Sequence, residues 1–134
     1  MTDPKVPVEI KLHRRSAVLE LIYADASASR FDAEFLRVFS PSAEVKGHGQ
    51  GQEVLQVGKR QVQIKGIEPV GNYAIRLIFD DGHSSGIYSW TYLDTLDSDR
   101  ETLWQSYLAR LAQAGKSRDA LPPDTQVITI KPPR

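Results

Sequence analysis

YAIRLIFDDGHSSGIYSW, residues 73–90, contains the pattern that decides the fold. Alternate side chains along its first half are apolar, which places them on one face of a strand: Tyr73, Ile75, Leu77 and Phe79. The Asp80–Asp81–Gly82 turn follows, and Gly82 tolerates the positive φ that tight hairpin turns require. Residues 86–90 are therefore predicted to return as the partner strand.

The flanking segments predict further hairpins. Apolar and polar residues alternate over 6–13, and a second strand pattern over 17–23 follows a short basic turn, so the two pair as a hairpin. Residues 24–30 are expected to form a polar turn, and Val54–Val57 with Val62–Ile64 to form another hairpin around residues 58–60. The V-G-N sequence of residues 70–72 predicts one more turn.

Two segments have helical periodicity. FDAEFLRVF, residues 31–39, predicts a short helix, because Pro41 disfavours helical backbone at Ser40. Ser98 and Glu101 have the spacing of a capping box, and the apolar positions that follow recur at helical spacing until Gly115. The sequence thus predicts an α+β fold: antiparallel β hairpins in a meander, one short helix after the first hairpin, and one C-terminal amphipathic helix packed on the sheet.

The length and composition predict one domain and a cytoplasmic protein. The chain has 134 residues, which fits a single domain over 1–115 followed by a flexible Pro-rich tail over 116–134, with 127–130 as a docking strand. Lys plus Arg equals Asp plus Glu at 17 each, so the global basic charge of nucleic-acid binders is absent. MTDPKVPVEI does not have a signal-peptide pattern, and no apolar run predicts a membrane partner.

The residues do not assemble an enzyme motif. None of His13, His48 and His83 begins an H-x-D or H-x-E pair, and the sequence contains no cysteine. In DDGHSSG, residues 80–86, acid, base and hydroxyl follow one another around one hairpin, so they cannot converge as a nucleophilic triad. A metal site at His48 and His83, with Asp80 or Asp81 as an oxygen ligand, is the stronger alternative.

Aromatic and basic residues leave two interpretations open. Four aromatic side chains either line a ligand surface or pack beneath the C-terminal helix: Tyr73, Tyr88, Trp90 and Tyr92. Arg37 either binds an anion or carboxylate ligand or forms a surface ion pair.

Two strings carry a resemblance to a known family: FLRVFSPSAEV at 35–45 and IEPVGNYAIRLIFDDGHSSGIYSW at 67–90. Within the second, G-N-Y-A-I-R and D-G-H-x-x-G-I-Y-S-W are specific. Over residues 8–96 the chain resembles bacterial single-domain relatives of the amino-terminal domain of gamma-butyrobetaine hydroxylase, a domain of unknown function. In the hydroxylases this domain precedes a catalytic domain that has no counterpart here, so the resemblance does not imply hydroxylase activity.

The resemblance also implies a changed zinc site. The family holds a structural zinc through a C-P-C-x-x-C loop and a later histidine, and the matching positions here are Ser40, Ser42, Val45 and His83. Only the histidine is kept, with His48 as the residue that would compensate in part. We therefore expect no resident cofactor, and a corner held by hydroxyl hydrogen bonds and by packing of Val45.

Three functional hypotheses follow. The first is a noncatalytic module that binds an unidentified protein partner. Because the resemblance extends to domains joined to Mrp-type iron–sulfur carrier ATPases, it implies an accessory role in iron or iron–sulfur metabolism. The second is a protein that binds zinc or iron through His83 and His48. The third is a small hydrolase that uses His83 with Ser84 or Ser85.

Overall fold

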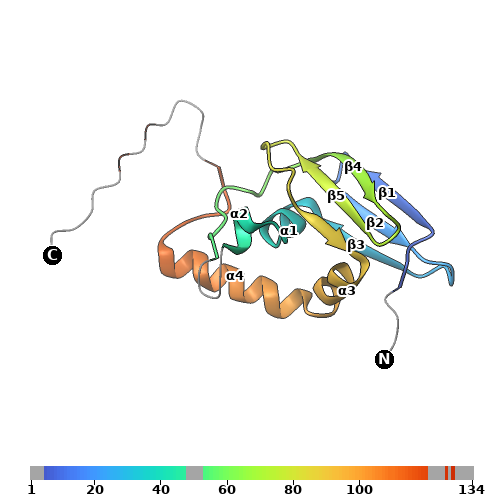
Figure 1. Ribbon diagram of the computed structural model, residues 1–134. Helices are drawn as coiled ribbons and strands as arrows, with labels where there is room; N and C mark the ends of the chain where they lie inside the picture. The colour runs from blue at the N-terminus through green and yellow to red at the C-terminus, as the bar shows by residue number, and fades with distance from the viewer. Residues whose placement is uncertain (1–4, 48–52, 121–125, 127, 129–134) are drawn as a thin grey trace.

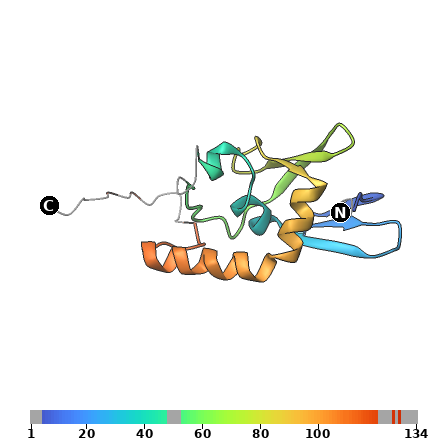
Figure 2. The ribbon, with the colours of Figure 1, turned by 60° about the horizontal axis from the view of Figure 1, so that its bottom comes forward.

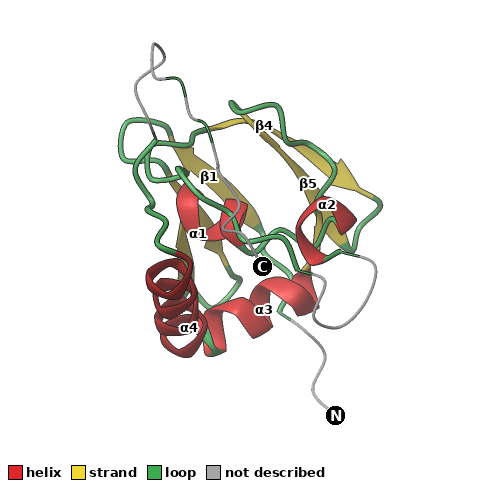
Figure 3. Cartoon of the chain, turned by 90° about the vertical axis from the view of Figure 1, so that its left-hand side faces the viewer, coloured by secondary structure: helices red, strands yellow, loops and turns green. Residues whose placement is uncertain are grey.

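The computed structural model describes residues 5–47, 53–120, 126 and 128. Its strands form two antiparallel sheets of three strands each, in the orders β1–β2–β3 and β4–β5–β6. In the views of Figures 1 and 3, helices α3 and α4 run below the two sheets. The α+β class is confirmed, with two small sheets in the meander. Within the described residues, no helix is long and apolar enough to cross a bilayer.

The first sheet contains one strand more than predicted. β1 (Glu9–His13) and β2 (Val18–Ile22) form the expected hairpin, and β3 (Ala28–Asp32) pairs with β2 on its other side. The prediction of a turn over 24–30 is therefore wrong for residues 28–30, which belong to β3. Arg30 lies opposite Glu20, and its Nε donates to the Glu20 carboxylate at 3.0 Å. Such cross-strand pairing stabilises a short polar strand whose own pattern is weak.

The second sheet is formed by β4 (Ile64–Val70), β5 (Ala74–Phe79) and β6 (Ile87–Ser89). The turns at 70–72 and 80–82 are confirmed, and Gly82 has a φ of 92°. Ile75, Leu77 and Phe79 are buried as predicted, but Tyr73 precedes the strand and is 57% exposed. Its place in the turn removes it from the alternating face.

The predicted hairpin of Val54–Val57 with Val62–Ile64 is wrong. Ile64 begins β4 and pairs with Phe79. The amides of Gly58 and Arg60 instead donate at 3.0 Å to carbonyl oxygens of residues 117 and 118, after the last helix. The backbone hydrogen bonds that a local hairpin would form are thus made with a distant part of the chain.

The structure contains α1 (Ala33–Val38), α2 (Ala43–Lys46), α3 (Trp90–Ser98) and α4 (Arg100–Ala114). The sequence patterns did not predict α2 and α3. The backbone N–H of Tyr92 donates to the Ser89 hydroxyl at 3.0 Å, which caps α3. Gly115 ends α4 with φ 64°, as expected.

The predicted capping box does not form. Ser98 is the last residue of α3, and Asp99 is the N-cap of α4 without a side-chain cap hydrogen bond. Figure 2 shows the chain bending between these two helices. The predicted helix corresponds to α4, and α3 directly precedes it in the chain. The position that the spacing indicated as a helix start is therefore the junction between α3 and α4.

One core connects the two sheets with α1 and α3, and its most buried members come from all four: Leu19, Phe31, Leu36, Leu77, Tyr88 and Leu93. A smaller cluster joins α1 to α4 through Val38, Tyr107 and Leu111. α4 also contacts α1 through the ring pair of Trp104 and Phe35, whose centroids are 6.2 Å apart. These contacts fix α1, and with it the start of the loop that follows α1.

Residues 116–120 were expected to begin the tail, and they contact the body of the domain. Besides the two backbone hydrogen bonds to residues 58 and 60, Arg118 forms an ion pair with Glu34 at 2.6 Å. The predicted docking strand at 127–130 lies outside the described residues except for Ile128.

Candidate functional site at a hydrogen-bonded corner

The positions that the resemblance assigns to zinc meet at one corner of the domain. Ser40 follows α1, Ser42 caps α2 by accepting from the Glu44 amide at 3.2 Å, and His83 lies in the β5–β6 hairpin. Ser40 is 0% exposed, and His83 is 5% exposed. The fold therefore brings Ser40, Ser42 and His83 together, whereas His48 lies outside the described residues.

Hydrogen bonds connect this corner into a chain. Ser40 Oγ lies 2.8 Å from His83 Nε2, and His83 Nδ1 lies 2.8 Å from Glu44 Oε2. Because an ionised carboxylate only accepts, the ring donates from Nδ1, and in the neutral tautomer Nε2 accepts the Ser40 hydroxyl proton. Ser42 Oγ and Ser85 Oγ are 2.6 Å apart. The expected hydroxyl hydrogen bonds are confirmed.

Val45 is buried, as expected, with an exposure of 6%, and its side chain adds apolar burial at this corner. The backbone of Gly86 packs against Ser40 and Tyr88. A Cβ at this position would lie 2.4 Å from Ser40 Oγ and 3.2 Å from a ring atom of Tyr88. The corner therefore requires glycine at residue 86 for space.

A charge cluster lies directly beneath His83. Asp81 accepts from the His83 backbone amide at 3.1 Å, from Arg37 at 2.8 Å and from Lys59 at 2.6 Å. Burial alone raises the pKa of Asp81, but Lys59, the His83 amide and Arg37 together lower it to about 2. Arg37 also donates to Gln56 at 2.9 Å. Of the two interpretations of Arg37, the structure shows an ion pair, and the pair is largely buried.

The order hydroxyl, imidazole and carboxylate matches that of a nucleophilic triad. A triad acts only when the hydroxyl oxygen reaches a substrate carbonyl, and the fully buried Ser40 offers no such approach. The predicted hydrolase pairing of His83 with Ser84 or Ser85 is not formed either, because Ser40 and Glu44 are the side-chain partners of the ring. In this structure the chain of hydrogen bonds stabilises the corner.

The residues present do not fit a zinc site of the family type. Valine has no donor atom, and both nitrogens of His83 already have hydrogen-bond partners. Two ligand atoms of a tetrahedral zinc lie about 3.3 Å or more apart. The 2.8 Å between Ser40 Oγ and His83 Nε2 is a direct hydrogen bond and leaves no room for a shared ion. Within the described residues, no cluster of three or more His, Cys, Asp or Glu side chains suits a metal.

The four aromatic side chains that were considered as a ligand surface have different surroundings. Tyr88 is 0% exposed and donates to the Leu36 carbonyl, and burial raises its pKa far above the usual range. Tyr92 is partly buried and donates to the Phe39 carbonyl at 2.7 Å. Trp90 donates to the Asn72 carbonyl at 2.9 Å, while Tyr73 is exposed. Tyr88, Tyr92 and Trp90 hold segments together, and they do not form a common ligand surface.

Sequence reasoning missed Glu44, Ser85 and Gly86 as members of the corner. Each has a partner more than 35 positions away in the chain, as the contacts of Glu44 with His83 and of Ser85 with Ser42 show. The only local signal was the position of Glu44 two residues after Ser42, within the loop that the resemblance had already singled out.

Most of the chain matches a known protein family. Residues 10–94 match the family model described as gamma-butyrobetaine hydroxylase-like, N-terminal. The chain belongs to the gamma-butyrobetaine hydroxylase-like N-terminal family. This match confirms the resemblance seen in the sequence and includes the corner with both of its loops.

Solved structures extend the family relationship to nearly the whole chain. A protein whose solution structure was determined by NMR is 49% identical, covers 96% of this chain and 98% of its own, and has a TM-score of 0.74. A second NMR structure is 45% identical, with coverages of 96% and 99% and a TM-score of 0.73. No curated protein matches the chain.

A crystal structure is similar to this chain over a smaller share of its length. This protein, from Acidithiobacillus ferrooxidans, is described as having unknown function and belonging to the DUF971 family. It is 39% identical, covers 72% of this chain and 98% of its own, and has a TM-score of 0.59. A structural relative of this chain is thus described as a protein of unknown function.

Proposed function

We propose that this chain is a noncatalytic protein-binding module that acts in the cytoplasm as an accessory to iron or iron–sulfur metabolism. The observation that carries the proposal is the closed corner, in which Ser40, His83 and Glu44 use their polar groups on one another. Ser40 and His83 are buried, and the hydroxyl and both ring nitrogens already have hydrogen-bond partners within the chain, so neither residue presents a reactive group to a substrate.

Two further features support this function. Within the described residues, every buried side-chain nitrogen and oxygen has a hydrogen-bond partner, as expected for a rigid domain that offers its surface. The second supporting feature is the family resemblance, because related domains are joined to iron–sulfur carrier ATPases or to a hydroxylase catalytic domain. Domains joined in one chain meet through interfaces that resemble transient protein–protein contacts, so a domain of this kind has a surface suited to a protein partner.

The test begins with capture from the protein's own cells and ends with purified components. The chain, immobilised through its N-terminus, is used to recover binding proteins, and each one is purified and titrated by calorimetry. We expect one partner to bind with a fixed stoichiometry. Failure of every purified protein to bind above background would contradict a binding function. An esterase or phosphatase activity that His83→Ala abolishes would contradict the noncatalytic part.

The metal alternative has its own measurement. Zinc and ferrous iron are titrated into ¹⁵N-labelled protein without a histidine tag, and backbone amide shifts are recorded. Because the corner is closed by direct hydrogen bonds, we expect no shift at equimolar metal. Shifts confined to residues 40–50 and 80–86 would instead favour metal binding at His83 and His48.

A further inference from the structure

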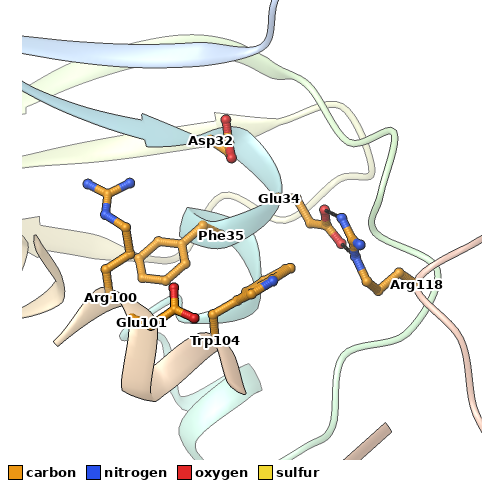
Figure 4. Close-up of a pocket in the computed structure, with 7 residues that line it drawn as sticks. All are labelled: Asp32, Glu34, Phe35, Arg100, Glu101, Trp104 and Arg118. Atoms are coloured by element: carbon orange, nitrogen blue, oxygen red, sulfur yellow. Dashed lines mark hydrogen bonds and ion pairs between the residues drawn. The ribbon is translucent and has the colours of Figure 1, made fainter. Parts of the chain in front are cut away.

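A cavity of about 190 Å³ lies between the end of β3, the start of α1, the first turns of α4 and residue 118. Figure 4 shows aromatic rings and side chains of both charges around it: Asp32, Glu34, Phe35, Arg100, Glu101, Trp104 and Arg118. None of these residues takes part in the hydrogen-bonded corner.

Part of this cavity forms a socket that holds a guanidinium group. Arg118 Nε donates to Glu34 Oε2 at 2.7 Å, and Arg118 Nη2 donates to Glu34 Oε1 at 2.6 Å. The same guanidinium lies 5.1 Å from the ring centroid of Trp104. The Glu34 side chain is only 9% exposed, so it is fixed in place for this bidentate contact. The Glu34–Trp104 socket therefore recognises the planar shape and the charge of an arginine side chain.

The arginine in the socket belongs to a loosely attached segment. Ser117, Asp119 and Ala120 are exposed, and the segment is joined to the body through polar contacts with residues 58–60. The Arg118 side chain is itself 26% exposed. A segment with little buried apolar surface opens at low free energy, so Arg118 is able to leave the socket while the core stays folded.

The residues that line the cavity carry more negative than positive charges, since three are acidic and two are arginines. Arg118 is paired with Glu34, and Arg100 is paired with Asp97 at 2.8 Å. The carboxylate of Asp32 does not cap α1, and Glu101 accepts only from the side-chain amide of Gln105. Among the described residues, Asp32 and Glu101 form no ion pair. These two carboxylates add negative potential around the cavity that Glu34 lines, which favours the approach of a cation.

The cavity also continues past Arg118. A second cavity of about 150 Å³ shares Asp32, Glu34 and Arg118 with the first and extends to Ser16 and Arg60. The two cavities therefore adjoin each other at the Glu34–Arg118 pair. Adjoining cavities at this pair leave room for the residues that flank an arginine side chain placed in the socket.

We propose that the Glu34–Trp104 socket binds an arginine side chain from a peptide segment of a partner protein, and that Arg118 occupies the socket until the partner displaces it. This inference rests on the proposed binding function and adds the surface and the chemistry of recognition. Arginine is preferred over lysine, because a single ammonium cannot make the two parallel hydrogen bonds that Glu34 accepts.

The test uses the peptide acetyl-Gly-Arg-Gly-amide and an otherwise identical peptide with citrulline, which has the same shape without the charge. Binding is followed by the NMR signal of the Trp104 indole, with the Trp90 indole as an internal reference because it donates to Asn72 at a different place. In the native chain Arg118 competes for the socket. Arg118→Ala should therefore bind the arginine peptide about tenfold more tightly than the native chain.

Lys116→Ala is the matched control, since it removes one exposed positive charge from the same segment, and it should leave the affinity unchanged. Glu34→Gln in the Arg118→Ala background should abolish binding, and the citrulline peptide should not shift the Trp104 signal. A lysine peptide should bind more weakly than the arginine peptide.

Several outcomes would overturn the site. One is that the arginine peptide causes no shift of the Trp104 signal in Arg118→Ala. Another is that the citrulline peptide shifts this signal as much as the arginine peptide does. A third is that Lys116→Ala raises the affinity for the arginine peptide as much as Arg118→Ala does. A failure of the socket can be told apart from a failure of the proposed binding function. If a partner identified by capture binds the Arg118→Ala, Glu34→Gln chain as well as the native chain, the binding function stands and this socket is removed from it.

Discussion

Replacement of Gly86 by alanine perturbs the corner at its tightest point. The new Cβ would lie 2.4 Å from Ser40 Oγ, about 1 Å inside ordinary contact. Ser40 is fully buried and is held by His83 and by the Ser42 amide, so its oxygen cannot move away without breaking these hydrogen bonds. The fold has to shift the backbone or lose the Ser40 contacts.

The expected loss of stability follows from these two effects. Overpacking a tight site destabilises by roughly 1–3 kcal/mol. A broken buried hydrogen bond adds about 1–1.5 kcal/mol, and the reduced freedom of the unfolded chain returns about 0.4–1 kcal/mol. We expect Gly86→Ala to lower the free energy of unfolding by about 1–4 kcal/mol, with the centre of the range at about 2–3 kcal/mol, which is a large part of the roughly 5–15 kcal/mol typical of a domain.

Urea unfolding followed by tryptophan fluorescence measures this change. A loss of 2–3 kcal/mol lowers the midpoint by about 1–2 M urea for a slope of roughly 1.5–2 kcal/mol per molar. Gly66→Ala is the control, because its new Cβ would meet only the Ile78 side chain, at ordinary contact distances of 3.4 and 3.9 Å. We expect its effect to stay below about 1 kcal/mol.

A double substitution tests the physical reason. Ser40→Gly removes the oxygen that the new Cβ meets, so Gly86→Ala should cost about 1–2 kcal/mol less in that background than in the native chain. If Gly86→Ala destabilises no more than Gly66→Ala, or if Ser40→Gly gives no relief, the close approach does not limit this position and our account of the corner is wrong.

Three further predictions concern groups around the corner and α4. Asp81 has a pKa lowered to about 2 from a model-peptide value of 3.8, so the stabilisation it provides is complete above pH 4 and is lost as pH falls towards 2. Asp81→Asn should therefore lower the free energy of unfolding by about 1–2 kcal/mol at pH 7, after allowance for solvent screening, and the difference from the native chain in urea midpoints should disappear as pH falls through this range. Tyr107 is 0% exposed and donates to a buried backbone carbonyl at 2.7 Å, so Tyr107→Phe should cost about 1–2 kcal/mol in urea unfolding, while Tyr73→Phe at an exposed position should have almost no effect. The Glu44 side chain is 66% exposed, so Glu44→Gln should change stability by less than about 1 kcal/mol, and a larger loss in the same assay would show that its contact with His83 is part of the core.

The sequence was most informative where the hydrophobic pattern is local and strong. The β5 pattern, the turn at Gly82 and the end of α4 at Gly115 were predicted from adjacent residues and are present in the structure. The third strand at 28–32 and the helix at 90–98 were missed. Their formation depends on pairing with β2 and on burial of Leu93 and Leu96, and neither contact is a property of the segment itself.

The corner could be predicted only in part. The family resemblance indicated which positions meet and that Val45 packs where a ligand would be, because a motif specifies a known loop geometry. It did not indicate that Glu44 would pair with His83, or that Ser42 and Ser85 would join the two loops. Those contacts depend on the angle at which α2 follows α1, which the motif does not specify.

The sequence by itself determined the α+β class, the turns at 70–72 and 80–82, the family and the absence of cysteine. These follow from residue identity and from the period of the hydrophobic pattern, which act within a few residues. Only the tertiary structure decided that the corner is closed around Ser40 and that Arg118 reaches Glu34 across 84 positions of the chain. Such contacts form when packing brings distant segments within hydrogen-bond distance, and the residues between them carry no local signal of that approach.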